Sequence, residues 1–223
     1  KRLSFAKKMN KHYPNTVWTE NINFFLDGVS FAYKRNLFDQ GSSPKGRIWG
    51  KPSEGLDYGC TAKGKKERSG GKLVKLMVAI SYEKGVIDCE QYDKMSGFYF
   101  KDYISRKFPV LFEKANKLNS KLWIQDGCPC QNSKAAKIAM SESGATLLSI
   151  PPRSPDINPI ENLSHLVRRE LDTQAISENK VYETYNEFAT RVINTFTSFS
   201  TQTIDNIIES MEKRMSCIIS RKG

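Results

Sequence analysis

The order of apolar and polar residues along the chain predicts alternating strands and helices, which is the pattern of an α/β protein. Short apolar runs predict strands at residues 21–27, 73–81, 85–89, 122–124 and 146–150. The second and third of these are close enough to form a hairpin, and we expect the hairpin to pair with the first strand. The fourth is continuously apolar, as expected for a strand buried on both faces. The crossover from the fourth to the fifth is long enough to place them parallel.

Segments with the apolar spacing of helices lie between and after these strands. Residues 98–118 predict a helix that Pro109 kinks or divides. A shorter helix is expected to run to about residue 141, with Asn132 or Ser133 as its cap and Gly144 after its end. Two more helices are expected after residue 171, because apolar residues recur at helical spacing: Val181, Tyr185, Phe188, Val192 and Phe196 in one, and Ile204, Ile207, Ile208, Met211 and Met215 in the other.

The first strand carries an acidic residue, Asp27, in apolar surroundings. Alternation places Ile22, Phe24 and Leu26 on one face and Phe25 with Asp27 on the other. One interpretation is a strand-end aspartate that starts a turn at the following glycine. The other is a functional carboxylate held by the strand.

A second acid, Asp126, directly follows the fourth strand. The carboxyl ends of parallel strands open the crevice in which α/β sheets bind ligands. After the fifth strand, a proline-rich segment leads to a helix with Asn158 as its cap and Pro159 in its first position. Glu161 lies in the first turn of that helix, and 34 residues (127–160) separate it from Asp126.

Two interpretations of Glu161 follow from its position. In a capping box, the glutamate would accept a hydrogen bond from the backbone N–H of Asn158. As a metal ligand, it would also have to stay ionised, which the positive end of the helix favours. Position alone does not distinguish the two.

Composition narrows the class of partner. The chain has 223 residues, enough for one well-formed core, and a net charge of +11 with an isoelectric point near 9.4. Such a charge favours a polyanion, nucleic acid before an anionic membrane. No apolar run has the length of a membrane span. The five cysteines are odd in number and include no C-x-x-C pair, so we expect reduced thiols rather than disulfides or structural zinc.

Residues 34–71 are rich in glycine, proline, serine and lysine, and they are too many for an ordinary connection. The segment is either a solvated loop or a basic surface that contacts DNA phosphates without reading sequence. The candidate cations at its end are Lys63, Lys65, Lys66, Arg68 and Lys72.

The segment PPRSPDINPIENL at 151–163 resembles the signature of the Tc/mariner superfamily of DNA transposases, in which it carries the last catalytic acid. Members with a glutamate there also place 34 residues between the second and third acids. FAKKMN at 5–10, WGKPSEGLDY at 49–58 and ESMEKRMSCIISRKG at 209–223 resemble further blocks of the same family. The similarity therefore extends over nearly the whole chain.

The resemblance implies a ribonuclease-H-like fold, a mixed sheet flanked by helices, with a basic insertion loop after the first strand and C-terminal helices. It implies that Asp27, Asp126 and Glu161 are catalytic and bind two Mg²⁺ ions, which Mn²⁺ can replace. The implied activity is excision at transposon ends and joining to TA target DNA, in the nucleus.

The resemblance also implies an organisation of the chain. Residues 1–20 would be an arm from an N-terminal DNA-binding region, and residues 21–223 the catalytic domain, including C-terminal helices at 174–223. Residues 34–71 would be a clamp loop that bridges a homodimer on DNA, anchored through Trp49, Lys51 and Pro52. Beyond this loop, the expected DNA contacts are Arg153, Arg168 and Arg169.

Two positions depart from the family pattern. Gln131 stands where relatives have a histidine, and Ser164 where they have a tryptophan. Both are expected near the active centre, so they put full activity in doubt. The alternative is a domesticated transposase-derived domain that binds DNA or a protein without catalysis. A structure-selective nuclease with the same fold is a third interpretation.

Overall fold

The computed structural model describes residues 1–13, 16–33, 72–117, 121–127, 129–152 and 154–221. The insertion at 34–71, including the clamp residues Trp49, Lys51 and Pro52 and the cations Lys63, Lys65, Lys66 and Arg68, lies outside the described residues, as does Arg153.

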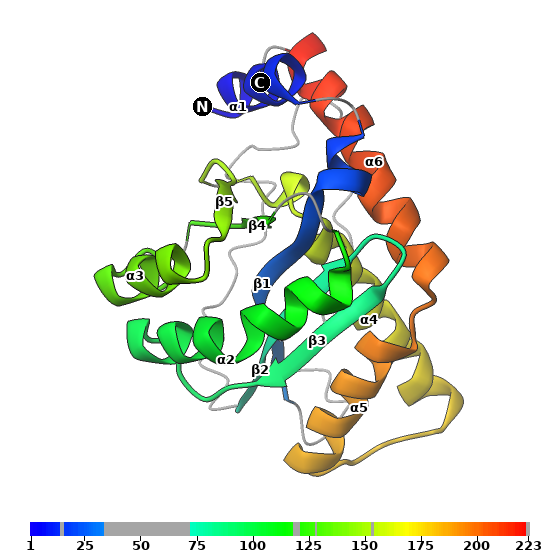
Figure 1. Ribbon diagram of the computed structural model, residues 1–223. Coiled ribbons are helices and arrows are strands. Elements are labelled where there is room, and N and C mark those ends of the chain that lie inside the picture. The colour runs from blue at the N-terminus through cyan, green and yellow to red at the C-terminus, as the bar shows by residue number, and fades with distance from the viewer. Residues whose placement is uncertain (14–15, 34–71, 118–120, 128, 153, 222–223) are drawn as a thin grey trace, which may run out of the picture.

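A five-stranded mixed sheet forms the centre of the molecule (Figure 1). Its strands are β1 (Ile22–Ala32), β2 (Leu73–Ser81), β3 (Gly85–Gln91), β4 (Leu122–Gln125) and β5 (Thr146–Ser149). They lie in the order β3-β2-β1-β4-β5. The hairpin β2–β3 pairs antiparallel with β1, while β4 lies parallel to β1 on its other side and β5 parallel to β4. The mixed sheet expected from the sequence is confirmed.

Helices cover both faces of the sheet. On one face, α2 (Gly97–Ala115) and α3 (Lys134–Glu142) pack against each other and against the sheet. On the other face lie α4 (Pro159–Ser177), α5 (Tyr185–Ser198) and α6 (Thr201–Ser220). The three layers give the ribonuclease-H-like arrangement.

Shorter elements join the second layer. Helix α1 (Arg2–His12) packs against α6 near the chain's two ends (Figure 1). A short π-helix, η1 (Val17–Asn21), leads into β1, and its buried Trp18 stacks on Phe25. A 3₁₀ turn, η2 (Pro155–Ile157), precedes α4. No helix within the described residues has the length and apolar character needed to cross a membrane.

Strand β1 separates two apolar cores because its side chains alternate between the faces of the sheet. Phe24 and Leu26 contact the α2–α3 layer, and Phe25 contacts the layer of α4 to α6. Ile22, which strict alternation assigned to the face of Phe24, lies instead in the core with Phe25. The cause is an irregular register between β1 and β4 at the start of the strand.

The helix boundaries differ from the predictions in two places, and in a third the structure decides between two predicted caps. Helix α2 contains Pro109 without being divided, and it ends at Ala115, where Asn116 takes a left-handed conformation. Ser133, rather than Asn132, caps α3 through a hydrogen bond from the N–H of Ala136. Val181 precedes α5 and is exposed, because the helix starts at Tyr185.

Candidate active site

A pocket of about 330 Å³ lies at the carboxyl ends of β4 and β5. It forms there because β4 ends at Gln125 and the prolines after β5 take the chain out of the sheet before α4 begins. Its lining contains Asp126 and Glu161, together with Gly127, Ile150, Pro151, Pro152, Ser154, Pro155 and Asn158. Folding therefore brings together two of the three acids predicted from the sequence, although 34 residues separate them.

Asp27 lies in the middle of β1, next to this pocket. The strand continues to Ala32, and Asp27 pairs with Val78 of β2, so the interpretation as a strand-end turn is wrong. The residue is only 5% exposed. Its carboxylate accepts two hydrogen bonds, from the N–H of Gly28 at 2.8 Å and from the side-chain amide of Asn158 at 2.7 Å.

Asn158 connects Asp27 to the helix that carries Glu161. Its Oδ1 accepts a hydrogen bond from the N–H of Ile160, as expected of a cap, while its Nδ2 donates to Oδ2 of Asp27. Its own N–H donates to the carbonyl of Pro155, so the capping-box interpretation of Glu161 is wrong. The Glu161 side chain is exposed in the pocket instead of folding back on the cap.

The three acids influence one another electrostatically. The pKa of Asp27 is raised well above its usual value, chiefly because the carboxyl is buried, and further by the negative charges of Asp126 and Glu161. The hydrogen bond from Gly28 acts in the opposite direction. A buried carboxyl surrounded by two others is a place where a cation would remove the repulsion.

The chemistry of these side chains fits a divalent metal. Carboxylate oxygens are the ligands that Mg²⁺ prefers, and an accumulation of negative charge favours its binding. The side chains must move to close around an ion, since among the described residues no three His, Cys, Asp or Glu side chains are arranged to hold one directly. One oxygen of Asp27 lies against the amide of Asn158, which can keep its hydrogen bond while the carboxylate binds metal.

Gln131 supports the second acid. The side chain is buried, and with its amide turned so that the nitrogen faces Asp126, it donates to Oδ1 at 3.2 Å and to the Asp126 carbonyl at 3.3 Å. Gln131, which stands where relatives have a histidine, thus contacts the second of the three acids. Ser164, the other departure, is fully buried below the first turns of α4, and its hydroxyl has no hydrogen-bond partner within the described residues.

The sequence predicted the three acids as metal ligands, but it did not predict the contact between Asn158 and Asp27. Asn158 was predicted only as a helix cap. The side-chain amide of Asn158 could have predicted this contact. An asparagine cap uses its side-chain oxygen, so the side-chain nitrogen remains free to donate to another acceptor.

The predicted DNA-binding residues that the structure describes lie apart from the pocket lining. Arg168 donates to the carbonyl of Ser30 at 3.1 Å and lies over the ring of Phe31, while Arg169 is exposed on α4. Lys72 lies over the ring of Tyr185. These side chains are placed along β1, β2 and their covering helices, and their role in DNA binding stays a prediction.

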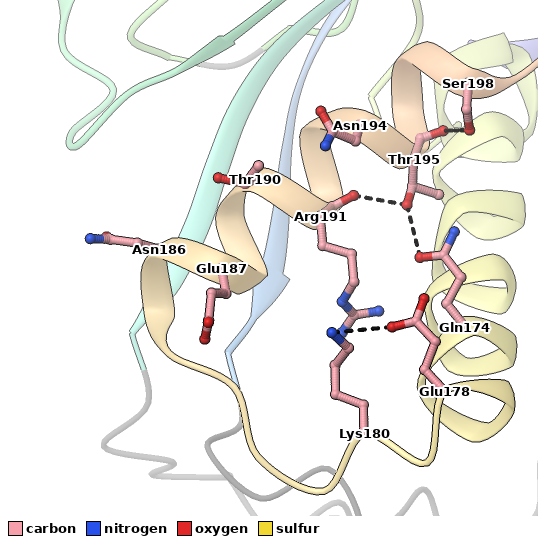
Figure 2. A pocket seen from close by; sticks show the side chains of 10 residues that line it. All are labelled: Gln174, Glu178, Lys180, Asn186, Glu187, Thr190, Arg191, Asn194, Thr195 and Ser198. Carbon is pink, nitrogen blue, oxygen red and sulfur yellow. Dashed lines mark hydrogen bonds and ion pairs between the residues drawn. The ribbon is translucent and has the colours of Figure 1, made fainter.

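A larger cavity of about 610 Å³ lies between α4 and α5 (Figure 2). Its cations are neutralised locally. Arg191 forms a buried ion pair with Glu183, and Lys180 pairs with Glu178 at 3.1 Å. Figure 2 also shows Thr195 bonded to Gln174 and to the carbonyl of Arg191. The cations of this cavity are therefore already paired with carboxylates, and the acidic pocket is the better candidate for catalysis.

The mixed sheet thus holds the buried Asp27 beside a pocket that contains Asp126 and Glu161. The sequence profile of the family described as "DDE superfamily endonuclease" matches residues 38–181. The chain belongs to this family.

Its relatives within the family are Tc/mariner transposases. The chain is 30% identical to the Tc3 transposase of Caenorhabditis elegans over its full length, and it spans 61% of that protein. Among solved structures, it is similar to the mariner Mos1 paired-end complex with Mg (TM-score 0.70, 13% identity, all of this chain and 61% of the other). A Mos1 paired-end complex with left transposon end gives a TM-score of 0.67 at 14% identity, again over all of this chain and 61% of the other.

Proposed function

We propose that this chain is the catalytic part of a cut-and-paste DNA transposase, which cleaves phosphodiester bonds at transposon ends and joins the ends to TA target DNA. The observation that carries the proposal is the grouping of Asp126 and Glu161 in one pocket. Their negative charges contribute to the raised pKa of the buried Asp27 beside it. Membership of the DDE endonuclease family and the likeness to Tc3 support it.

In this proposal Asp27, Asp126 and Glu161 are the catalytic acids and hold two Mg²⁺ ions, for which Mn²⁺ can substitute. The Mos1 paired-end complex contains Mg, which supports the choice of metal. When bound, such ions activate the attacking oxygen and stabilise the leaving oxygen of an in-line displacement. The chain's own side chains have other tasks: Asn158 orients the Asp27 carboxylate and Gln131 the Asp126 carboxylate.

The partners proposed are transposon ends, TA target DNA and a second copy of the chain assembled on DNA. A Mos1 structure contains a transposon end, which supports the first of these. The net charge of +11 supports a polyanionic partner as well. Because the proposed substrate is DNA, we further propose that the protein acts in the nucleus.

The test is strand cleavage of a terminal-repeat duplex with Mg²⁺ or Mn²⁺. Asp126→Asn and Glu161→Gln should each abolish nicking, a loss of at least about 10³-fold, because an amide cannot supply the charge that binds metal. The control is Glu142→Gln, which also removes one negative charge but at an exposed position at the end of α3. This variant should cleave DNA like wild type.

Two outcomes would contradict the proposal. DNA binding without any metal-dependent nicking, unchanged by Asp126→Asn, would identify a non-catalytic remnant. Cleavage that is indifferent to end sequence and is never followed by joining would identify a nuclease.

A further inference from the structure

A second pocket, of about 410 Å³, lies on the other side of η2 from the acidic pocket. Asp156 of η2 lines it, whereas the neighbouring Ser154 and Pro155 line the acidic pocket. The remaining walls come from α1 and the last turns of α6, which lie together near the two ends of the chain (Figure 1). One short turn therefore separates the two pockets.

This second pocket is strongly basic. Its lining contains four cations, Arg2, Lys213, Arg214 and Arg221, and one carboxylate, Asp156; Ser210, Cys217 and Ile218 complete it. We call it the basic pocket. An excess of three positive charges around a concave surface attracts anions.

The single carboxylate is already engaged. Arg2 forms a bidentate ion pair with Asp156, with its two nitrogens 2.5 and 2.6 Å from the two carboxylate oxygens. The pKa of Asp156 is lowered, first by this hydrogen bond. Asp156 is therefore neutralised by Arg2, and the charges of the α6 side chains remain.

Arg214 is held by neutral acceptors. It donates to the carbonyl of Asp156 at 2.9 Å and to the side-chain oxygen of Asn162 at 2.7 Å. Its pKa is lowered because the guanidinium is partly desolvated. A desolvated cation whose hydrogen bonds go to a carbonyl and an amide favours an additional anion in the pocket. Asn162 directly follows Glu161, so the basic pocket also contacts the helix turn that carries the proposed catalytic acid.

Side chains on one face of α6 complete an anion site. Lys213, Cys217 and Arg221 are spaced four residues apart, and all three are exposed. Residues at this spacing lie above one another on a helix. Lys213 and Arg221 thus form a basic edge, with the Cys217 thiol between them.

We propose that the basic pocket binds a backbone phosphate of the DNA strand that enters the acidic pocket. The identification of the anion as DNA rests on the proposed function, while the charge and shape of the pocket do not. Cations of this kind position a nucleic acid without reading its sequence. The site would hold the strand on one side of η2 while the acids act on the other.

The first experiment measures binding of a labelled DNA duplex to the full chain in the presence of a chelator, over a range of salt concentrations. Lys213→Gln, Arg221→Gln and the double variant are compared with Lys101→Gln, which removes an exposed charge from α2 on the opposite face of the sheet. Each lost phosphate contact should reduce the slope of log K against log salt by about 1. Affinity in the double variant should fall at least about tenfold, whereas Lys101→Gln should change neither quantity comparably. If the double variant and Lys101→Gln had the same DNA affinity and the same salt slope, the proposal would be overturned.

Cys217 provides a second, local readout. Its thiol is exposed in the basic pocket, so its alkylation by N-ethylmaleimide, followed by peptide mass spectrometry, reports occupancy. Saturating DNA should slow alkylation of Cys217 severalfold in wild type and much less in the Lys213→Gln, Arg221→Gln double variant. An unchanged rate at saturating DNA would overturn the proposal, as would protection by inorganic phosphate but not by DNA.

The two proposals fail separately. The binding and alkylation experiments contain no metal and do not depend on the catalytic acids. Loss of nicking in every preparation would therefore count against the proposed function alone. Full nicking, with Cys217 alkylated equally fast with and without DNA, would count against the basic pocket alone.

Discussion

The Asn158 side chain makes two contacts at once, and together they connect the start of a helix to the candidate site. Its side-chain oxygen caps α4 and its nitrogen holds Asp27 of β1. The chemical reason is that an amide side chain offers both an acceptor and donors, whereas an ionised aspartate cap has no donor to give to a second carboxylate. Asn158 is therefore a positioning residue for Asp27.

Replacing Asn158 by alanine should separate these tasks. Loss of the cap should cost about 1 kcal/mol of stability. Loss of the contact with Asp27 should weaken Mn²⁺ binding by about 10- to 100-fold. Thermal unfolding and titration calorimetry with Mn²⁺ measure the two effects.

The matched control is Ser200→Ala, which removes the cap of α6. It should lower stability by a similar amount and leave Mn²⁺ affinity unchanged. If both variants reduced Mn²⁺ affinity equally, the contact between Asn158 and Asp27 would have no special role.

The raised pKa of Asp27 predicts how protein stability and Mn²⁺ affinity change with pH. Because the folded protein holds this proton at pH values where the unfolded chain has lost it, stability of the metal-free protein should fall as pH rises from about 4 through the raised value. Metal binding requires the ionised carboxylate, so Mn²⁺ affinity should rise over the same interval. Thermal midpoints between about pH 4 and pH 8, with chelator and with Mn²⁺, test both statements.

Asp27→Asn is the reference for this experiment, since it cannot titrate. In chelator, the thermal midpoint of wild type minus that of this variant should fall as pH rises. Mn²⁺ should raise the thermal midpoint of wild type alone. A difference that does not vary with pH would mean that Asp27 titrates near its ordinary value.

At the scale of elements, the start of α2 packs closely against the start of α3. The loop from Asp126 to Ser133 lies between β4 and α3, and its end meets the start of α2. Gly97 is the contact point: a Cβ there would lie 2.6 Å from the hydroxyl oxygen of Ser133 and 2.9 Å from its Cβ. The absence of a side chain at residue 97 allows Ser133 to cap α3.

Gly97→Ala should therefore destabilise the protein, by about 1–3 kcal/mol, because Ser133 has to leave its place. Denaturant unfolding measures the change. The double variant Gly97→Ala, Ser133→Gly should recover part of the loss, since it removes the atoms that the new Cβ meets. Additive losses in the double variant would show that the two residues do not compete for space.

At the scale of the whole molecule, β1 is the element on which both cores and the site depend. Residues Ile22 to Asp27 are buried without a break, and the strand is paired on both sides. The buried carboxylate of Asp27 lies between the apolar layers. Stability and the candidate site therefore depend on the same strand.

Hydrogen exchange should show this dependence. Amides of β1 and β2 should exchange only through global unfolding and be the slowest in the chain, while α1, which packs mainly on α6, should exchange faster. Mass spectrometry of peptic peptides measures the order. Faster exchange in β1 than in α1 would contradict the central role of the strand.

The sequence by itself determined the order of strands and helices, the proline exit from β5 and the cap at Asn158, and it predicted the three acids of the candidate site. These features follow from local chemistry: side-chain period, backbone restrictions of proline, and a motif whose spacing is written in the chain. The length of β1 and the place of Ile22 did not follow, because pairing with β2 extends the strand and an irregular register with β4 shifts its start.

Only the tertiary structure decided which neighbours the acids have. It placed the Asn158 amide on Asp27, the Gln131 amide beside Asp126, and a basic pocket formed by α1, η2 and α6 beside the acidic one. These contacts join residues far apart in the chain, and their energies depend on distance and burial, which a linear sequence does not contain.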